Sequence, residues 1–255
     1  MAEIIAITSQ KGGVGKTTTA VNLAASLAIL ERKTLLVDMD PQGSIAASFR
    51  MSEADIKSGM YQVFVNKLPL SDAVIDVGLS DLYIVPTNIH DETEEIEFFR
   101  YNMDFDLLKK ILHPHRALYE YIIIDCPPSL GSPTINAINA ADSLIIPVQS
   151  EYYSLKALGK FIRLVRQISS KYNPSLTFKG FLVTMYDKRI KKNQENLDKL
   201  RYSLKKTVFD TTIPRNAKLA EAPSVGRPVA LFDIGSPGAL GYLQLAEEII
   251  TSNSK

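Results

Sequence analysis

The sequence of 255 residues contains no tryptophan, one cysteine and no long apolar run. A single cysteine cannot form an internal disulfide or supply a metal cluster, so we expect Cys126 to be a small core residue. No stretch approaches the roughly 20 apolar residues that a membrane-spanning helix requires. The first residues, Met1 to Ile4, lack the charged and apolar regions of a secretory leader. These absences predict a cytoplasmic protein without a membrane partner.

The sequence also lacks a strong net charge, although its charges are unevenly distributed. The formal net charge is +1, which by itself gives no indication of a nucleic-acid partner. Residues 156–206, however, hold fourteen lysines and arginines against three acidic residues, so this segment carries +11 and the remainder carries −10. An asymmetry of this size favours one face built for a polyanion. A solvated basic face with no partner is the alternative interpretation.

Composition and length fit a single α/β domain over residues 1–255. Hydrophobic residues make up 45% of the chain and charged residues 22%, which excludes a disordered protein. The predicted strands are short β-branched runs at residues 4–8, 34–38, 82–86, 121–125, 143–148 and 178–184. The predicted helices lie at residues 17–30, 104–112, 134–140, 152–170, 194–206 and 238–250. This alternation indicates three layers, with a mostly parallel twisted sheet covered by helices on both faces.

The sequence gives a detailed prediction for the last helix but none for two earlier segments. In the last predicted helix, residues at helical spacing predict the buried face: Leu240, Leu243, Ala246 and Ile250. Residues 51–80 and 87–103 predict no clear element.

The stretch after the first strand, SQKGGVGKTTTA at residues 9–20, has the features of a phosphate-binding loop. The common pattern G-x-x-x-x-G-K-[ST] requires a glycine at position 10, where this chain has Gln10. Three glycines still allow positive φ and close approach of a ligand to the start of a helix. They are Gly12, Gly13 and Gly15. Lys16 would then contact the β- and γ-phosphates of a nucleotide, and the Thr17 hydroxyl would hold Mg²⁺.

Aspartates end two other predicted strands. Asp38 and Asp40 lie at the tip of the strand 34–38, and Asp125 follows four apolar residues in the strand 121–125. The carboxyl ends of parallel strands form the ligand-binding edge of such a sheet. Asp125 in this position is typical of a carboxylate that holds Mg²⁺ or its water ligands, although alone it could cap a turn. We expect Asp40 to orient the water that attacks a phosphate, and Asp38 to support the metal indirectly.

Five segments together carry a resemblance to a known family. They are KGGVGKT at 11–17, DMDPQGS at 38–44, DCPPS at 125–129, PVQSEYY at 147–153 and IPRN at 213–216. Over about residues 3–250 the chain resembles the ParA/Soj family of chromosome- and plasmid-partition ATPases, whose phosphate loop is of the deviant Walker A type. The resemblance implies the P-loop NTPase fold, with ATP and Mg²⁺ as cofactors and hydrolysis of ATP to ADP and phosphate.

The resemblance also implies which residues contact ATP. In this family the extra lysine, here Lys11, reaches across a dimer interface to the nucleotide of the other subunit, and it acts in catalysis with Lys16 and Asp40. The implied ATP-binding residues are Lys11, Gly12, Gly13, Val14, Gly15, Lys16, Thr17, Thr18, Met185, Pro214 and Asn216. The last three would line the adenine, although IPRN is equally plausible as a turn that ends a strand.

The segment 185–206 consists of a basic loop followed by a basic helix. Lysines and arginines in such a segment favour sequence-independent contacts with DNA phosphates. Nothing in it resembles a helix-turn-helix or a zinc finger, so base-specific recognition is not expected. The candidate DNA contacts are Lys188, Arg189, Lys191, Lys192 and Lys218. The resemblance to Soj-like proteins implies Arg189 and Lys218, with lysine replacing an arginine at the second position.

The implied partners are a second copy of the chain in the ATP state, non-specific double-stranded DNA, and a ParB-type centromere-binding protein that stimulates hydrolysis. The protein would associate with the nucleoid, and no separate N-terminal DNA-binding domain is expected.

Three alternative functions have different sequence requirements. A MinD-like, membrane-associated division-site regulator should end in a basic amphipathic helix, whereas residues 247–255 begin with two glutamates. An iron–sulfur carrier or reductase needs a pair of bridging cysteines, whereas each subunit has only Cys126. A DNA-binding module without ATP turnover is hard to reconcile with the presence of Thr17, Asp40 and Asp125.

Overall fold

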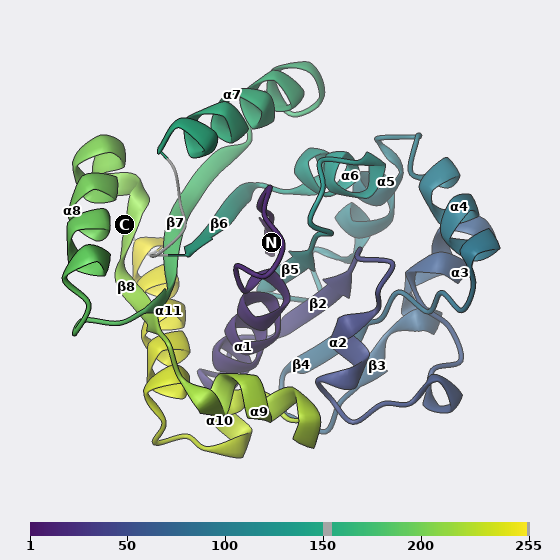
Figure 1. Ribbon diagram of the computed structural model, residues 1–255. Coiled ribbons are helices and arrows are strands. Elements are labelled where there is room, and N and C mark those ends of the chain that lie inside the picture. The colour runs from purple at the N-terminus through teal and green to yellow at the C-terminus, as the bar shows by residue number, and fades with distance from the viewer. Residues whose placement is uncertain (150–154, 254–255) are drawn as a thin grey trace.

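An eight-stranded sheet forms the centre of the computed structural model, which describes residues 1–149 and 155–253 (Figure 1). The strands are β1 (Glu3–Ile7), β2 (Thr34–Asp38), β3 (Ile75–Asp76), β4 (Leu82–Val85), β5 (Tyr121–Asp125), β6 (Ser143–Gln149), β7 (Thr177–Tyr186) and β8 (Val208–Pro214). Their order across the sheet is β3-β4-β2-β5-β1-β6-β7-β8. β3 is antiparallel to β4, and the other neighbours are parallel. The prediction of a mostly parallel sheet is confirmed.

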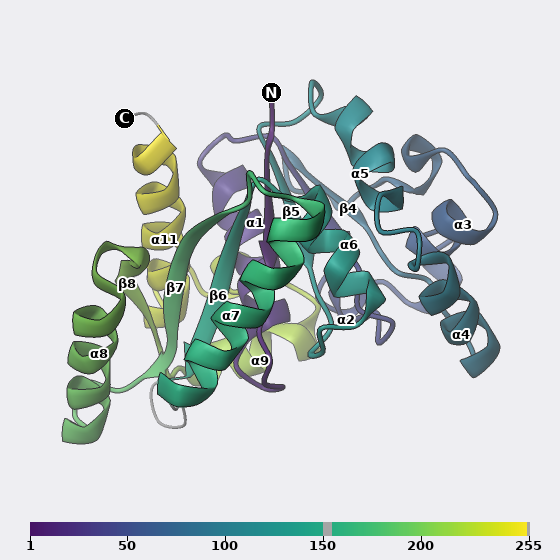
Figure 2. The same cartoon turned by 90° about the horizontal axis from the view of Figure 1, so that it is seen from above.

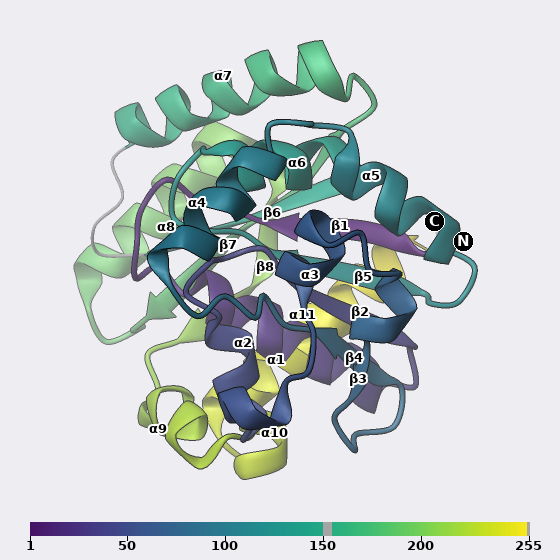
Figure 3. The same ribbon diagram turned by 90° about the vertical axis from the view of Figure 1, so that its right-hand side faces the viewer.

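Helices cover both faces of the sheet, as Figure 3 shows. On one face lie α3 (Met60–Val65), α4 (Glu92–Tyr101), α5 (Leu107–Leu112), α6 (Ser132–Ala140), α7 (Leu155–Tyr172) and α8 (Lys191–Leu204). On the other lie α1 (Lys16–Ile29), α2 (Ser44–Ala47), α9 (Ala217–Val225), α10 (Val229–Phe232) and α11 (Pro237–Asn253). Short 3₁₀ turns lie at Glu53–Asp55, Leu70–Ala73, His113–His115 and Lys205–Thr207. Viewed from above, α8 and α4 occupy opposite edges of the molecule (Figure 2).

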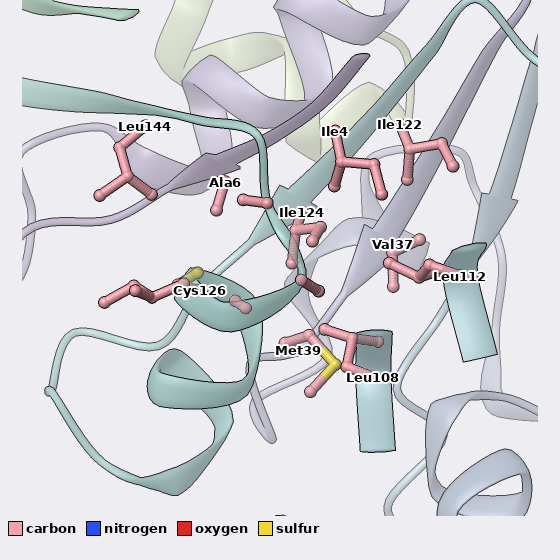
Figure 4. Packing of buried hydrophobic residues seen from close by; sticks show 14 of the residues in the cluster. Ile4, Ala6, Val37, Met39, Leu108, Leu112, Ile122, Ile124, Cys126 and Leu144 are labelled. Atoms are coloured by element: carbon pink, nitrogen blue, oxygen red, sulfur yellow. The ribbon is translucent and has the colours of Figure 1, made fainter. Parts of the chain in front are cut away.

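The central strands are mostly buried because helices shield both faces. Every residue of β2 and β5 is buried. Figure 4 shows side chains of β1, β2 and β5 in one cluster, in which Leu108 and Leu112 of α5 lie beside Met39 and Val37. Cys126 is fully buried in the same cluster, which confirms that it is a core residue.

The parallel register brings together residues that are far apart in the chain. Asp38 at the end of β2 pairs with Asp125 at the end of β5, and Asp125 pairs with Ile7 at the end of β1. The loop that follows Ile7 contains the glycine-rich residues 9–15 and leads into α1. The aspartates and this loop therefore share one edge of the sheet, as the sequence predicts.

All six predicted strands are present within two residues of their expected bounds. β3 and β8 were not predicted, because β3 has two residues and β8 is an edge strand with the polar sequence VFDTTIP. The short helices α2, α3, α9 and α10 and the acidic helix α4 were also missed. The start of α4 carries a readable signal, since the Asp91 carboxylate accepts a hydrogen bond from the Glu94 N–H at 2.9 Å.

Two predicted helices need correction or qualification. Residues 152–154 of the helix predicted at 152–170 lie outside the described residues, and α7 is described from Leu155 to Tyr172. In α11 the predicted buried stripe is confirmed only in part, because Ala246 is fully buried and Ile250 packs against the core, whereas Leu240 is 48% exposed. The buried face is formed by Ala239, Tyr242, Leu245, Ala246 and Ile249. Both sets repeat every three or four residues, so spacing alone cannot choose between them. In the described part of the chain no helix is long and apolar enough to cross a membrane.

The packing of β7 against β8 can be tested by substitution of Gly180. A Cβ atom at this position would lie 2.4 Å from Cε2 of Phe209, a buried residue of β8. We expect Gly180→Ala to lower the free energy of unfolding by about 1–3 kcal/mol through overpacking, measured by urea denaturation. Gly159→Ala is the matched control, because a Cβ there meets nothing within 4 Å inside α7. It should raise stability by about 0.5–1 kcal/mol. Equal stability of the Gly180→Ala variant and the parent would contradict the described packing.

Candidate functional site

The glycine-rich loop connects β1 to α1 and is shaped by two glycines with left-handed backbone conformations. Gly13 has φ +72° and Gly15, the N-cap of α1, has φ +89°. The loop is fixed to β7 because the Thr184 hydroxyl donates a hydrogen bond to the Val14 carbonyl at 2.8 Å. The N–H groups of the first turn of α1 are thereby directed at the loop, where an anion would be stabilised.

The two lysines of the loop differ in exposure. Lys16, at the first position of α1, is only 7% exposed, and a buried ammonium requires an anionic neighbour. Lys11 is exposed, and its carbonyl accepts a hydrogen bond from the Ser9 hydroxyl at 3.0 Å. Lys16 therefore lies inside the site, whereas Lys11 lies at its outer rim.

Asp125 is a fully buried carboxylate at this edge of the sheet. Burial raises the pKa of Asp125 to about 7, an effect opposed by the neighbouring Thr17 hydroxyl and by Lys16. Among the described residues, neither of its oxygens has a hydrogen bond of ordinary geometry. Oxygen ligands of this kind suit Mg²⁺. The carboxylate of Asp125 and the hydroxyl of Thr17 thus fit a magnesium ion beside the phosphates.

Asp38 has a different environment. Burial raises the pKa of Asp38 well above its ordinary value, and the nearby charge of Asp125 adds to the shift. Its Oδ1 accepts the Asp40 N–H at 3.0 Å and its Oδ2 accepts the Ile45 N–H at 3.3 Å. Both oxygens are thus bonded to the backbone of the following loop. The indirect role of Asp38 at the metal stays a prediction, and its observed contacts shape the loop that contains Asp40.

Asp40 lies within that loop and is 9% exposed. Its Oδ1 accepts the Gln42 N–H at 3.1 Å, and its carbonyl accepts the Gly43 N–H at 3.0 Å. Asp40 also contributes to the raised pKa of Asp125, so the two carboxylates are near neighbours. The three predicted aspartates therefore gather at one edge, with Asp40 at its solvent side.

A second part of the site is a cavity of about 230 Å³ between β7, β8 and α9. Met185, Pro214 and Asn216, the three predicted adenine contacts, all line it together with Gly15 and Thr18 of the phosphate loop. Met185 has φ +51°, which is uncommon for a residue with a Cβ. The Oδ1 atom of Asn216 is buried without a hydrogen bond to the described residues. This oxygen could accept the exocyclic amine of an adenine.

Sequence reasoning missed three residues that support the site. Tyr242 of α11 lines the cavity, and its hydroxyl lies 3.2 Å from Thr19 Oγ1 of α1. Asn22 of α1 accepts the Val229 N–H at 2.7 Å and donates to the Thr18 carbonyl. Thr87 lies within hydrogen-bond distance of the Asp40 carbonyl. No motif marks them, because each residue has a partner in a distant part of the chain.

The candidate DNA contacts fall into two groups. Lys188, Arg189, Lys191 and Lys192 surround the start of α8 and are exposed. Lys218 lies on α9, in the other helical layer. Basic residues at a helix N-terminus oppose the helix dipole, and the first turn of α8 has no acidic residue. This arrangement concentrates positive charge at one end of α8.

Both residues singled out by the resemblance form ion pairs within the chain. Arg189 binds Asp187 through two side-chain hydrogen bonds, of 3.0 and 2.7 Å. These bonds lower the pKa of Asp187 to about 2. Lys218 Nζ lies 2.7 Å from Glu221 Oε2. A phosphate that approached either cation would therefore compete with a carboxylate.

A glycine loop at a helix N-terminus, a buried lysine and a strand-end aspartate define a P-loop nucleotide-binding protein. A family model described as an AAA domain matches residues 2–178. The chain is 42% identical to the chromosome partitioning protein ParA of Myxococcus xanthus over 98% of this chain and 88% of that protein. It is also 42% identical to the sporulation initiation inhibitor protein Soj of Bacillus subtilis, over 98% of each. The chain belongs to the ParA/Soj family of partition ATPases.

The fold is shared with a solved enzyme of another name. Cobyrinic acid a,c-diamide synthase from Mycobacterium smegmatis superposes with a TM-score of 0.84 at 27% identity, covering 100% of this chain and 97% of that chain. The likeness confirms the P-loop NTPase fold.

The raised pKa of Asp125 predicts a pH-dependent stability of the protein without nucleotide and metal. Between the ordinary pKa near 3.8 and about 7, the folded state retains a proton that the unfolded state releases. Stability therefore falls as pH rises through this window. We expect Asp125→Asn to raise the free energy of unfolding at pH 8 by about 2–4 kcal/mol, with a smaller gain at pH 5. Urea denaturation at the two pH values measures the difference.

Asp72→Asn, at an exposed aspartate remote from the site, is the control for loss of one negative charge. It should change stability little at either pH. An Asp125→Asn variant with the same gain at both pH values would contradict the raised pKa.

Proposed function

We propose that the protein is an ATP-dependent DNA-partitioning switch. ATP binding drives two chains into a dimer that contains the nucleotides between them, and this dimer binds DNA without sequence preference. Hydrolysis of ATP then releases the dimer from DNA. The observation that carries the proposal is the pair of lysines in one phosphate loop, one buried and one exposed.

The site geometry supports ATP with Mg²⁺ as the ligand. Lys16 and the first turn of α1 would contact the phosphates, and Thr17 and Asp125 would hold the metal. The cavity lined by Met185, Pro214 and Asn216 would take the adenine. Bound Mg²⁺ neutralises charge that develops on the phosphate oxygens. The mycobacterial synthase with the same fold was solved with an ATP analogue and magnesium.

Asp40 is proposed to orient the attacking water. Of the three aspartates it is the one at the solvent side, and its backbone is held by Asp38 and by residues of its own loop. A fixed carboxylate favours an in-line geometry for the water and the γ-phosphate. Asp40, Lys16 and Lys11 form the proposed catalytic set.

Lys11 is proposed to act across the dimer interface. Two ammonium groups in one loop repel unless polyphosphate lies between them. An exposed Lys11 at the rim can contact a phosphate held by the facing subunit, so dimerisation becomes linked to ATP binding.

DNA binding is proposed for the positive end of α8, with Lys218 as a further contact. Phosphate contacts of lysine and arginine provide affinity without reading sequence. A ParB-type centromere-binding protein is proposed to stimulate hydrolysis, and the protein would then associate with the nucleoid. A partition role is preferred to a MinD-like membrane role because one of the two relatives compared above is named for chromosome partitioning and the other is a Soj protein.

Loss of Lys11 tests the proposed switch. We expect Lys11→Ala to bind ATP but to remain monomeric by sedimentation velocity, and to lose ATP-dependent DNA pelleting by more than tenfold. The parent should pellet with DNA in ATP but not in ADP or without nucleotide, and less at the higher of two salt concentrations. Lys110→Ala, an exposed lysine on α5, is the matched control and should behave like the parent. ATP-driven dimerisation of Lys11→Ala would overturn the proposal, and binding to liposomes without binding to DNA would favour the MinD-like alternative.

The Asp187–Arg189 pair tests the DNA surface in both directions. Arg189→Ala should weaken DNA binding severalfold and spare dimerisation. Asp187→Asn should strengthen DNA binding two- to fivefold at low salt. In the parent, the Asp187 carboxylate competes with a DNA phosphate for Arg189, and the substitution removes this competitor. The asparagine can still accept the Arg189 N–H. Asp104→Asn, which removes one carboxylate from a pair with Lys110, controls for net charge. DNA affinity unchanged in both Arg189 and Asp187 variants would exclude this surface.

A further inference from the structure

Thr87 lies directly beyond the end of β4 and is fully buried. β4 pairs with β2 in parallel, and the last pair of that ladder is Val37 with Val85. Beyond this pair, β2 and β4 have no further ladder hydrogen bonds among the described residues. The segment after β2 forms the loop that contains Asp40. The Thr87 side chain lies in the region where the pairing stops.

The Thr87 hydroxyl connects the segment after β4 to the segment after β2. Its Oγ1 donates to the Asp40 carbonyl at 2.7 Å and lies 3.3 Å from the Asp38 carbonyl. The second distance is long for a hydroxyl donor, so the Asp40 carbonyl is the principal acceptor. The hydrogen bond joins the backbone of the proposed catalytic residue to the sheet. It is complementary to Asp38, whose carboxylate holds the backbone N–H of Asp40 from the other side.

Thr87 is itself held in place by its backbone. The Tyr61 N–H of α3 donates to the Thr87 carbonyl at 2.9 Å, and the Met60 N–H donates to the Pro86 carbonyl at 2.7 Å. Gly59 permits this close approach, because a Cβ there would lie 2.3 Å from the Pro86 carbonyl oxygen. The N-terminus of α3 therefore fixes the segment from which the Thr87 hydroxyl extends.

We infer that Thr87 is a positioning residue for ATP hydrolysis, which acts by holding the backbone of Asp40 through a buried hydrogen bond. The inference rests on the proposed role of Asp40 in orienting water. A buried hydroxyl that fixes a loop restricts the carboxylate of Asp40 to a narrow range of positions, which favours in-line attack. Thr87 contacts no phosphate-loop residue through these bonds, so ATP affinity should not depend on it.

Thr87→Val removes the hydroxyl and keeps the shape of the side chain. We expect kcat for ATP to fall at least fivefold, with KM for ATP within twofold of the parent and ATP-dependent dimerisation retained. Thr87→Ser restores the hydroxyl and should recover at least half of the parent kcat. Thr34→Val is the matched control, because Thr34 is a fully buried threonine at the start of β2 whose hydroxyl donates to the Arg32 carbonyl at 2.8 Å. It should lower thermal stability but leave kcat within twofold.

A double-mutant cycle with Asp40→Ala separates this inference from the proposed function. If Thr87 acts through Asp40, adding Thr87→Val to Asp40→Ala should not lower the residual turnover further. Asp40→Ala with parental kcat would refute the proposed role of Asp40. Asp40→Ala with reduced kcat, together with Thr87→Val at parental kcat, would overturn the role of Thr87 alone. An equal further loss in the Asp40→Ala background, or failure of Thr87→Ser to recover activity in a folded protein, would also overturn it.

Discussion

The burial of charge at one edge of the sheet is the constraint on which the site depends. Lys16, Asp38 and Asp125 are each less than a tenth exposed, and an isolated charge in such a place costs many kcal/mol. The parallel register forces Asp38 and Asp125 side by side, so they cannot avoid one another by a small shift. Burial is the main cause of the raised pKa of both carboxyl groups, and the charge of Asp125 adds to the shift of Asp38. A bound cation would relieve this cost for the carboxylates, and a polyphosphate would relieve it for Lys16.

The aspartates share the edge but divide its tasks. Asp38 bonds to two backbone N–H groups of the following loop, whereas the oxygens of Asp125 have no such bonds of ordinary geometry in the described part of the chain. Asp125 therefore retains its capacity for a metal ion, and Asp38 has already used most of its own. Asp40 receives a fixed backbone from Asp38 and Thr87.

The sequence was most informative where structure is local. β1, the phosphate loop and α1 follow one another without interruption, so glycine spacing and strand pattern were enough to place Lys16 and Thr17. Asp125 was predictable because a fully apolar strand must end at the ligand edge. Tyr242, Asn22 and Thr87 were not predictable, since each meets its partner across 47 or more residues or between layers. The buried face of α11 was predicted only in part, because the residues of both possible stripes recur every three or four positions.

Two residues with proposed binding roles lie on α9 and at its N-cap. Asn216, the N-cap of α9, lines the adenine cavity, and Lys218 lies two residues later on the surface. At the other end, Gly226 lies against Arg50, and a Cβ on Gly226 would come within 2.1 Å of the Arg50 side chain and 2.6 Å of its backbone nitrogen. Arg50 follows α2, the helix that begins after the Asp40 loop. Because there is no space for even a Cβ at Gly226, the end of α9 packs closely against Arg50. A nucleotide that moved Asn216 would therefore act on the helix that carries Lys218 and packs beside Arg50, which is the geometry that the proposed coupling between nucleotide and DNA binding requires.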